Sequence, residues 1–200
     1  MIDAVVFDLG NVLIGWDPRH LYRELIEDEA AREHFLTRVC SMAWNEEQDA
    51  GRGWAEAVEL LAAEFPEHRA LIEAYDHEWH RMLSGPIEGS VVLLRALKAR
   101  GVPLFALTNW STEKFPIARA RYDFLRLFEG IVVSGEERMK KPDPRIFETL
   151  VSRYQLTPSS TLFIDDSRVN IVAAEKLGFV VHHFAGAEGL AVRLQALGLL

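Results

Sequence analysis

Four polar groups that lie far apart in this sequence each follow a short apolar run, and together they could do chemistry. They are Asp8; Thr108 with Asn109; Lys140 with Lys141; and Asp165 with Asp166. Carboxylates that converge in one crevice repel one another unless a cation lies among them, and an all-oxygen ligand set suits Mg²⁺. A lysine and a hydroxyl beside such a cluster can hold the oxygens of a phosphoryl group. The set therefore indicates phosphoryl transfer with Asp8 as the nucleophile.

Taken alone, Asp8 would be explained as well by a turn. It stands two residues before Gly10, and aspartate and glycine are both common where a strand ends in a turn. The functional interpretation of Asp8 therefore depends on whether the three downstream groups meet it in space.

Short buried strands are the elements that would bring these groups together. Strand-like apolar runs are expected around Val5–Phe7 and at 102–107, 131–134, 161–164 and 180–183. Helical patterns separate them, and strands that alternate with helices predict a doubly wound α/β fold with a parallel sheet covered on both faces. Ligands of such sheets bind beyond the carboxyl ends of the strands, which is where the polar groups would lie.

The segment from 14 to 83 follows the first strand and contains no convincing strand of its own. Its apolar residues recur at helical spacing, as in the stripe Val58, Leu61, Ala62 and Phe65. We therefore expect a helical insertion at 14–83 and an α/β core built from 1–13 and 84–200.

The composition is that of an ordinary globular protein and argues against several classes of function. The chain has 200 residues, 49% of them hydrophobic and 26% charged. Its net charge of −8 and the lack of a Lys/Arg run argue against nucleic-acid binding. No apolar stretch is long enough to span a membrane, no secretory leader is recognisable, and the single Cys40 excludes an internal disulfide. These features favour a cytoplasmic location.

The four segments resemble the motifs of the haloacid dehalogenase (HAD) superfamily of aspartate-nucleophile hydrolases, and the likeness covers essentially the whole chain. The matching segments are Asp8-Leu9-Gly10-Asn11-Val12, Thr108 in FALTN, Lys141 in KKPDPRIF, and Asp165-Asp166 in LFIDDSRVN. Each motif alone is weak, but their order and spacing together are specific.

The resemblance implies a role for each matching residue. Asp8 would attack phosphorus, and Thr108 and Lys141 would bind the phosphoryl oxygens. Mg²⁺ would be held by Asp8, the backbone carbonyl of Gly10, Asp166, and Asp165 either directly or through water. Asn170, one turn beyond Asp166, would support that loop.

The helical insertion resembles the small cap of this family, which closes over the site. By that resemblance, Trp44, Asn45 and Asp49-Ala50-Gly51 would form the cap loop that faces the crevice. Substrate contacts are expected from Trp44 and Asn45 in the insertion and from Asn109 and Trp110 in the core.

One position departs from the family pattern. Phosphatases of the family usually carry a second aspartate two residues after the nucleophile, which protonates the leaving group, and this chain has Gly10 there. Some members that act on sugar phosphates resemble this chain in their Asp-Leu-Gly-Asn start. A positioned acid is ordinarily worth about 10²–10⁴-fold in rate.

The expected function is that of an Mg²⁺-dependent phosphomonoester hydrolase, acting on a small phosphorylated metabolite such as a sugar phosphate through an aspartyl-phosphate. One alternative is a 2-haloacid dehalogenase, which needs no acid for a departing halide and for which Arg19 could grip the carboxylate; the Asp165-Asp166 pair argues against it. The other is a non-catalytic member that lost turnover with Gly10. A monomer or homodimer is expected.

Overall fold

The computed structural model describes all residues 1–200 and contains a five-stranded parallel sheet. The strands lie in the order β5-β4-β1-β6-β7, which places the first strand of the chain at the centre. Their bounds are β1 (Ala4–Phe7), β4 (Leu104–Thr108), β5 (Gly130–Val133), β6 (Thr161–Asp165) and β7 (Val180–His183). The predicted doubly wound α/β fold is confirmed, and each predicted strand is found to within two residues at its ends.

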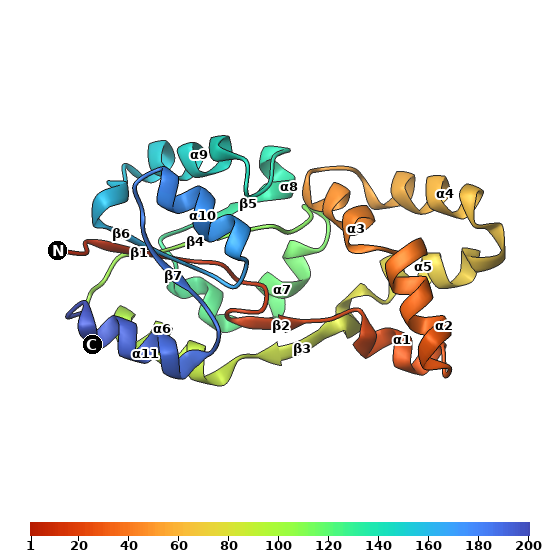
Figure 1. The fold of residues 1–200 in the computed structure, drawn as a ribbon, viewed down its shortest axis with the longest axis horizontal. Helices are drawn as coiled ribbons and strands as arrows, with labels where there is room; N and C mark the ends of the chain where they lie inside the picture. Colours follow the sequence, from red (N-terminus) through yellow and green to blue (C-terminus); the bar gives the residue numbers. More distant parts are fainter.

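Helices cover both faces of this sheet (Figure 1). One face is covered by α6 (Glu88–Ala99), α7 (Phe115–Arg121) and α11 (Ala187–Ala196), and the other by α9 (Pro144–Tyr154) and α10 (Arg168–Lys176). Successive side chains of a strand point to opposite faces. Accordingly Val5 and Phe7 belong to one buried cluster and Val6 to the other. Both faces of β1 are therefore buried, as its continuous apolar run requires.

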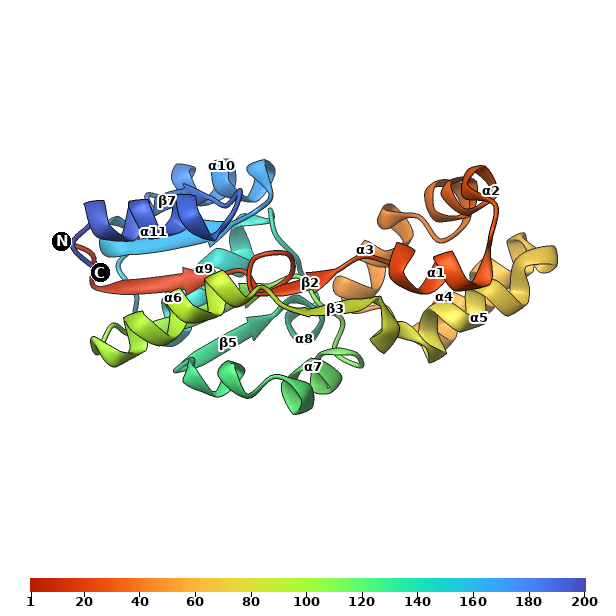
Figure 2. The same ribbon diagram turned by 90° about the horizontal axis from the view of Figure 1, so that it is seen from below.

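The helices between residues 19 and 82 gather at one end of the molecule, away from the sheet (Figures 1 and 2). They are α1 (Arg19–Leu25), α2 (Glu29–His34), the π-helical turn Phe35–Val39, α3 (Met42–Asp49), α4 (Trp54–Glu64) and α5 (Arg69–His77), followed by a 3₁₀ turn at Trp79–Met82. Tyr22, Phe35, Trp54 and Tyr75 are fully buried or nearly so among them. None of the helices has the length and apolar character needed to cross a bilayer.

A two-stranded antiparallel ribbon connects this helical end to the sheet, and the sequence did not predict it (Figure 2). It consists of β2 (Ile14–Trp16) and β3 (Leu83–Pro86), with Gly15 opposite Gly85. The expectation of no strand between 14 and 83 was wrong because these strands are too short and glycine-rich to show an alternating pattern. A Cβ at Gly15 would lie 2.0 Å from the Ser84 hydroxyl oxygen, so any larger residue at position 15 would require that hydroxyl to move. The ribbon lies at both boundaries proposed between core and insertion, and that division stays a prediction.

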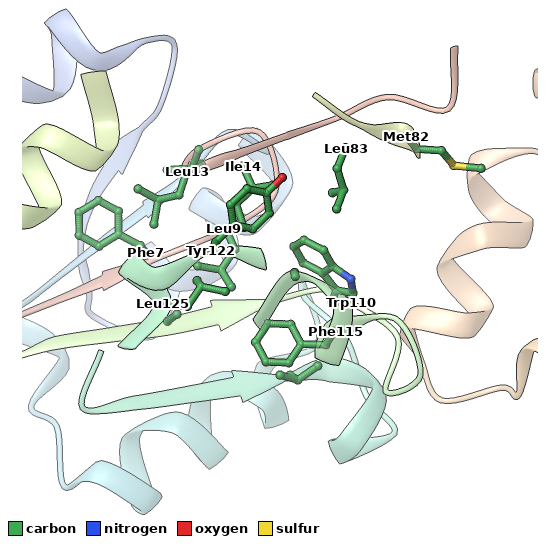
Figure 3. Close-up of a cluster of buried hydrophobic side chains, with 14 of the residues drawn as sticks. Phe7, Leu9, Leu13, Ile14, Met82, Leu83, Trp110, Phe115, Tyr122 and Leu125 are labelled. Carbon is green, nitrogen blue, oxygen red and sulfur yellow. The ribbon is translucent and has the colours of Figure 1, made fainter. Parts of the chain in front are cut away.

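The two ends of the molecule share one hydrophobic core. A cluster of 39 buried residues runs from Phe7 in the sheet to Trp54 and Tyr75 in the helical end. Figure 3 shows the part of it where the loop after β1 meets β3 and the segment after β4; the labelled residues are Phe7, Leu9, Leu13, Ile14, Met82, Leu83, Trp110, Phe115, Tyr122 and Leu125. Apolar packing thus fixes the loop that follows Asp8 against the segment that follows Thr108.

Candidate active site

The carboxyl ends of the three central strands bring the predicted reactive groups together. Asp8 directly follows β1, Thr108 ends β4 and Asp165 ends β6. The register pairs Phe7 with both Ala106 and Ile164, so the three strands end at the same level. The geometry of a parallel sheet alone therefore places these side chains at one edge.

The buried side chain of Lys141 lies between Asp8 and Asp165 and pairs with both. Its Nζ lies 3.0 Å from Asp8 Oδ1 and 2.7 Å from Asp165 Oδ2, and it donates to the Leu107 carbonyl at 2.8 Å. The side chain is fully buried. Burial alone would lower the pKa of Lys141, but Asp8 and Asp165 raise it above its usual value, so the ammonium form is held.

Asn109 positions the backbone of Lys141. Its Oδ1 accepts from the Lys141 amide at 2.8 Å, and its Nδ2 donates to the Lys141 carbonyl at 3.0 Å. The two bonds join the end of β4 to the segment that precedes α9. Asn109 was predicted to contact substrate; it lines the cavity described below, and its amide is already engaged with the lysine.

Three carboxylates form a set that could hold a cation. Asp8, Asp165 and Asp166 each offer an oxygen, and these oxygens all lie within 4.8 Å of one another. Burial, opposed by Lys141, raises the pKa of Asp8, and the charges of Asp165 and Asp166 raise it further. With only one lysine among three carboxylates, the set is short of positive charge, and a divalent cation with a preference for oxygen would supply it.

The hydrogen bonds of Asp165 distinguish it from the other two carboxylates. Asn170 Nδ2 donates to both of its oxygens at 3.1 Å, the Ser167 amide donates to Oδ1 at 2.8 Å, and Lys141 occupies Oδ2. Asn170 therefore lies where a support for this loop was expected. Asp165 is fully buried and amply bonded, whereas Asp166 is exposed.

Thr108 presents a hydroxyl without a partner. Its Oγ1 is buried and makes no hydrogen bond, and the residue is fully buried at the end of β4. An unsatisfied buried hydroxyl costs about 1–3 kcal/mol, and such a group in a native fold calls for an explanation. Thr108 itself does not line the cavity described below, but the next two residues, Asn109 and Trp110, do.

A cavity of about 210 Å³ opens above these groups, between the sheet edge and the helical end. Its lining from the core is Asp8, Gly10, Asn11, Asn109, Trp110 and Asp166, and from the helical end Trp16, Met42, Asn45, Glu46, Asp49 and Trp79. Of the predicted substrate contacts, Asn45, Asn109 and Trp110 line this cavity. Trp110 packs against Trp79 with ring centroids 5.5 Å apart.

Trp44 is not brought to the cavity. Its ring packs edge-on against Trp54 and Tyr75, with centroids 5.7 and 5.1 Å away. The segment is a helix, α3, rather than the expected loop: Ser41 is its N-cap and accepts from the Trp44 amide at 3.2 Å. On a helix, positions 42, 45, 46 and 49 share one face and position 44 lies on another. The serine cap followed by this spacing was the signal that could have found Met42 and Glu46 as lining residues.

The helical end is tied to the core around the rim of this cavity. Ser134 Oγ donates to the Asp49 carbonyl at 2.6 Å, Trp54 Nε1 donates to Ser111 Oγ at 2.9 Å, and Lys140 Nζ pairs with Glu46 at 2.8 Å. Glu113 accepts from the Trp54 amide at 2.9 Å, and Lys114 pairs with Asp76. These bonds hold α3 over the reactive groups.

Arg19 lies outside this cavity. Its guanidinium is paired with Glu33 at 2.6 Å and with Asp17 at 3.4 Å. The carboxylate grip on which a dehalogenase interpretation relied is therefore already occupied by residues of the chain itself.

The sequence is similar to a family of hydrolases and to phosphatases of known substrate. The family model described as haloacid dehalogenase-like hydrolase matches residues 2–178. The chain is 26% identical to the sesquiterpene phosphatase astK of Aspergillus oryzae, over 97% of this chain and 95% of that protein. It is 23% identical to the validoxylamine A 7'-phosphate phosphatase of Streptomyces hygroscopicus subsp. limoneus, over 89% and 83% of the two chains.

The fold is similar to that of a HAD family enzyme from Bacteroides thetaiotaomicron, solved as a complex with magnesium and inorganic phosphate. The two structures match with a TM-score of 0.69 and 25% identity, over 91% of this chain and 93% of the other. The arrangement of Asp8, Lys141 and the Asp165-Asp166 pair at the strand ends, together with a family model that spans most of the sequence, shows that this chain belongs to the haloacid dehalogenase-like hydrolases.

Proposed function

We propose that this chain hydrolyses a phosphomonoester of a small molecule, with Asp8 as the nucleophile. The observation that carries the proposal is the buried ammonium of Lys141, which lies 3.0 Å from Asp8 Oδ1. The neighbouring strand β4 ends in the unpartnered hydroxyl of Thr108. A cation beside the nucleophile and a free donor are what the oxygens of a phosphoryl group need. Phosphatases among its relatives and the phosphate-bound neighbour support the same chemistry.

The residues divide the reaction among them. An Asp8 oxygen forms a bond to phosphorus while the bond from phosphorus to the leaving oxygen breaks, and water then hydrolyses the resulting aspartyl-phosphate. Lys141 and Thr108 hold the phosphoryl oxygens through both steps. Asp165 holds Lys141 in place.

The same edge of the sheet suits a magnesium ion. Asp8, the Gly10 carbonyl and Asp166 would hold it, with Asp165 kept back by its bonds to Lys141 and Asn170. When bound, the ion neutralises phosphoryl charge and orients the phosphoryl group toward Asp8.

A sugar phosphate is the substrate class that we favour. Asn45, Glu46 and Asp49 offer polar groups that could bind hydroxyls, and Trp110 and Trp79 offer aromatic surface for a sugar ring. The residues 14–83 would act as a cap that selects the organic part. A monomer or homodimer and a cytoplasmic location stay predictions from the sequence.

The test is phosphate release from a panel of sugar phosphates, an aminocyclitol phosphate and farnesyl phosphate, with Mg²⁺ or with chelator. Asp8→Asn serves as the blank, and Asp3→Asn, an exposed aspartate in front of the same strand, serves as the matched control. We expect Mg²⁺-dependent release that is lost in the blank and kept in the control. No release from any member would contradict the proposal, and chloride release from 2-haloacids would then favour the dehalogenase.

A further inference from the structure

The site as described lacks a group that protonates the leaving oxygen, and this question rests on the function proposed above. Asp8 forms the new bond, Asp166 would hold the metal ion, and Asp8 and Asp165 raise the pKa of Lys141 so that it keeps its proton. An alkoxide is a poor leaving group, so an alkyl phosphomonoester needs an acid. The floor of the cavity provides none, because Gly10 has no side chain there.

Two carboxyl groups of α3 face the same cavity from the opposite wall, and they differ in their partners. Glu46 is paired with Lys140 Nζ at 2.8 Å, and its side chain is 45% exposed. Asp49 forms no ion pair; Asn45 Nδ2 donates to its Oδ2 at 3.2 Å, and the Ser111 backbone also donates to the carboxyl group. Of the two, Asp49 is therefore the one free to carry and release a proton.

The position of Asp49 is fixed by the core. Ser134 Oγ donates to its carbonyl at 2.6 Å and accepts from the Trp110 amide at 2.9 Å. Asp49 is thus anchored, through one hydroxyl, to the segment that carries Thr108 and Asn109. This hydrogen bond fixes the position of the Asp49 backbone relative to the residues at the sheet edge.

The surroundings of Asp49 favour its protonated form. Burial and the charge of Glu46 raise the pKa of Asp49 to about 7, against the opposing effects of Lys140 and the Ser111 backbone. Asp49 is the last residue of α3, and the carbonyl ends of a helix disfavour a negative charge there. Both protonation states are then available near neutral pH, which suits acid–base catalysis.

We propose that Asp49 is the general acid and base of this site. Its carboxyl proton passes to the leaving oxygen as that oxygen separates from phosphorus, which yields the free alcohol, the Asp8 phosphate and the Asp49 carboxylate. The carboxylate then takes a proton from the water that attacks phosphorus. Phosphate and the Asp8 carboxylate are released, and Asp49 regains its proton. Asp49 on α3 would thus provide the acid that other phosphatases of the family carry at the position of Gly10.

Two substrates of similar shape separate this role from a structural one. In 4-nitrophenyl phosphate the phenolate leaves without a proton, whereas the benzyl alkoxide of benzyl phosphate requires one. We expect Asp49→Asn to lower kcat/KM for benzyl phosphate by about 10²–10³-fold and to change it for 4-nitrophenyl phosphate by less than about tenfold. Glu46→Gln, on the same helix and in the same cavity, should change both substrates by the same factor.

A second variant tests whether the missing proton can be restored. A Cβ at Gly10 would meet no atom within 4 Å, so the backbone there has room for the first atom of a side chain that extends into the cavity. We expect Gly10→Asp in the Asp49→Asn background to recover much of the rate on benzyl phosphate. Asp49→Asn should also abolish the fall in wild-type kcat for benzyl phosphate as pH rises through about 7, because the acid must be protonated to act.

The outcomes separate the inference from the function on which it rests. If Asp49→Asn lost activity equally on both substrates, or kept its rate on benzyl phosphate, the role of Asp49 would be overturned. Hydrolysis of 4-nitrophenyl phosphate by the wild-type protein would still support the phosphatase function. Wild-type protein that released phosphate from neither substrate would remove the proposed function and the inference with it. Thermal unfolding of each variant excludes loss of the fold as the cause.

Discussion

The two walls of the cavity are built in different ways. The sheet wall consists of strand ends, where Asp8, Thr108 and Asp165 are buried and fixed by the backbone register. The helical wall includes one face of α3, where Met42 is 51% exposed and the Glu46 side chain 45%. The proposed nucleophile and the groups that support it thus lie on the sheet wall, whereas the proposed general acid, Asp49, lies on the helical wall. A reaction that draws on both walls depends on how the two are held together.

Replacing Lys141 removes the cation of the sheet wall, and we expect this substitution to have the largest effect on stability and activity. Lys141→Ala would leave Asp8 and Asp165 buried without their cation, and loss of one partner of a buried ion pair costs about 3–5 kcal/mol. We expect a loss of that size in the free energy of unfolding, measured by urea denaturation, together with loss of turnover. Lys140→Ala, one residue away and paired at the surface, should cost no more than about 1 kcal/mol; equal costs for the two variants would contradict this view of the site.

Magnesium should stabilise the sheet wall and do so through Asp166. An ion that binds only the folded state adds about 2.7 kcal/mol when its free concentration is 100 times Kd. We expect Mg²⁺ to raise the unfolding temperature of the wild-type protein, and Asp166→Asn to remove most of that shift without changing the fold. An unchanged shift in Asp166→Asn would show that the ion binds elsewhere.

Ser134→Ala sharpens the comparison because Ser134 joins the two walls. The substitution removes the bonds to the Asp49 carbonyl and the Trp110 amide, and leaving such groups unsatisfied costs about 1–3 kcal/mol. We expect a stability loss in that range and a greater fall in kcat/KM for benzyl phosphate than for 4-nitrophenyl phosphate. Equal falls on the two substrates would show that Ser134 does not act by holding Asp49.

The smallest expected effect is a difference in KM between variants of Trp44 and Trp110. Trp44 packs away from the cavity and Trp110 lines it. We expect Trp44→Phe to leave KM within about twofold of wild type, since a conservative aromatic replacement outside a pocket removes no substrate contact. Trp110→Phe should raise KM by a larger factor. Both variants are measured by steady-state kinetics on one sugar phosphate that the wild-type protein hydrolyses. A larger rise in KM for Trp44→Phe would show that Trp44 is the substrate contact.

The sequence was informative about the sheet wall for a physical reason. A parallel strand places its last residue at a fixed edge, so finding the strand suffices to place Asp8, Thr108 and Asp165. To place residues of the helical wall, one must know which residues share a face of the helix, and not only which segment is helical. With Ser41–Asn45 taken as irregular, Trp44 and Asn45 could not be assigned to different faces, and Met42 and Glu46 were missed. The ribbon of β2 and β3 was missed because Gly15 and Gly85 carry no side-chain pattern.

The covalent intermediate tests the central claim most directly. Protein quenched with acid during turnover of a substrate with a radiolabelled phosphoryl group would be digested, and the labelled peptide identified by mass spectrometry. The label is predicted on the peptide that contains Asp8, and none should be retained by Asp8→Asn. A label on a peptide that lacks Asp8, or one that persists in Asp8→Asn, would contradict the assignment of this aspartate as the nucleophile.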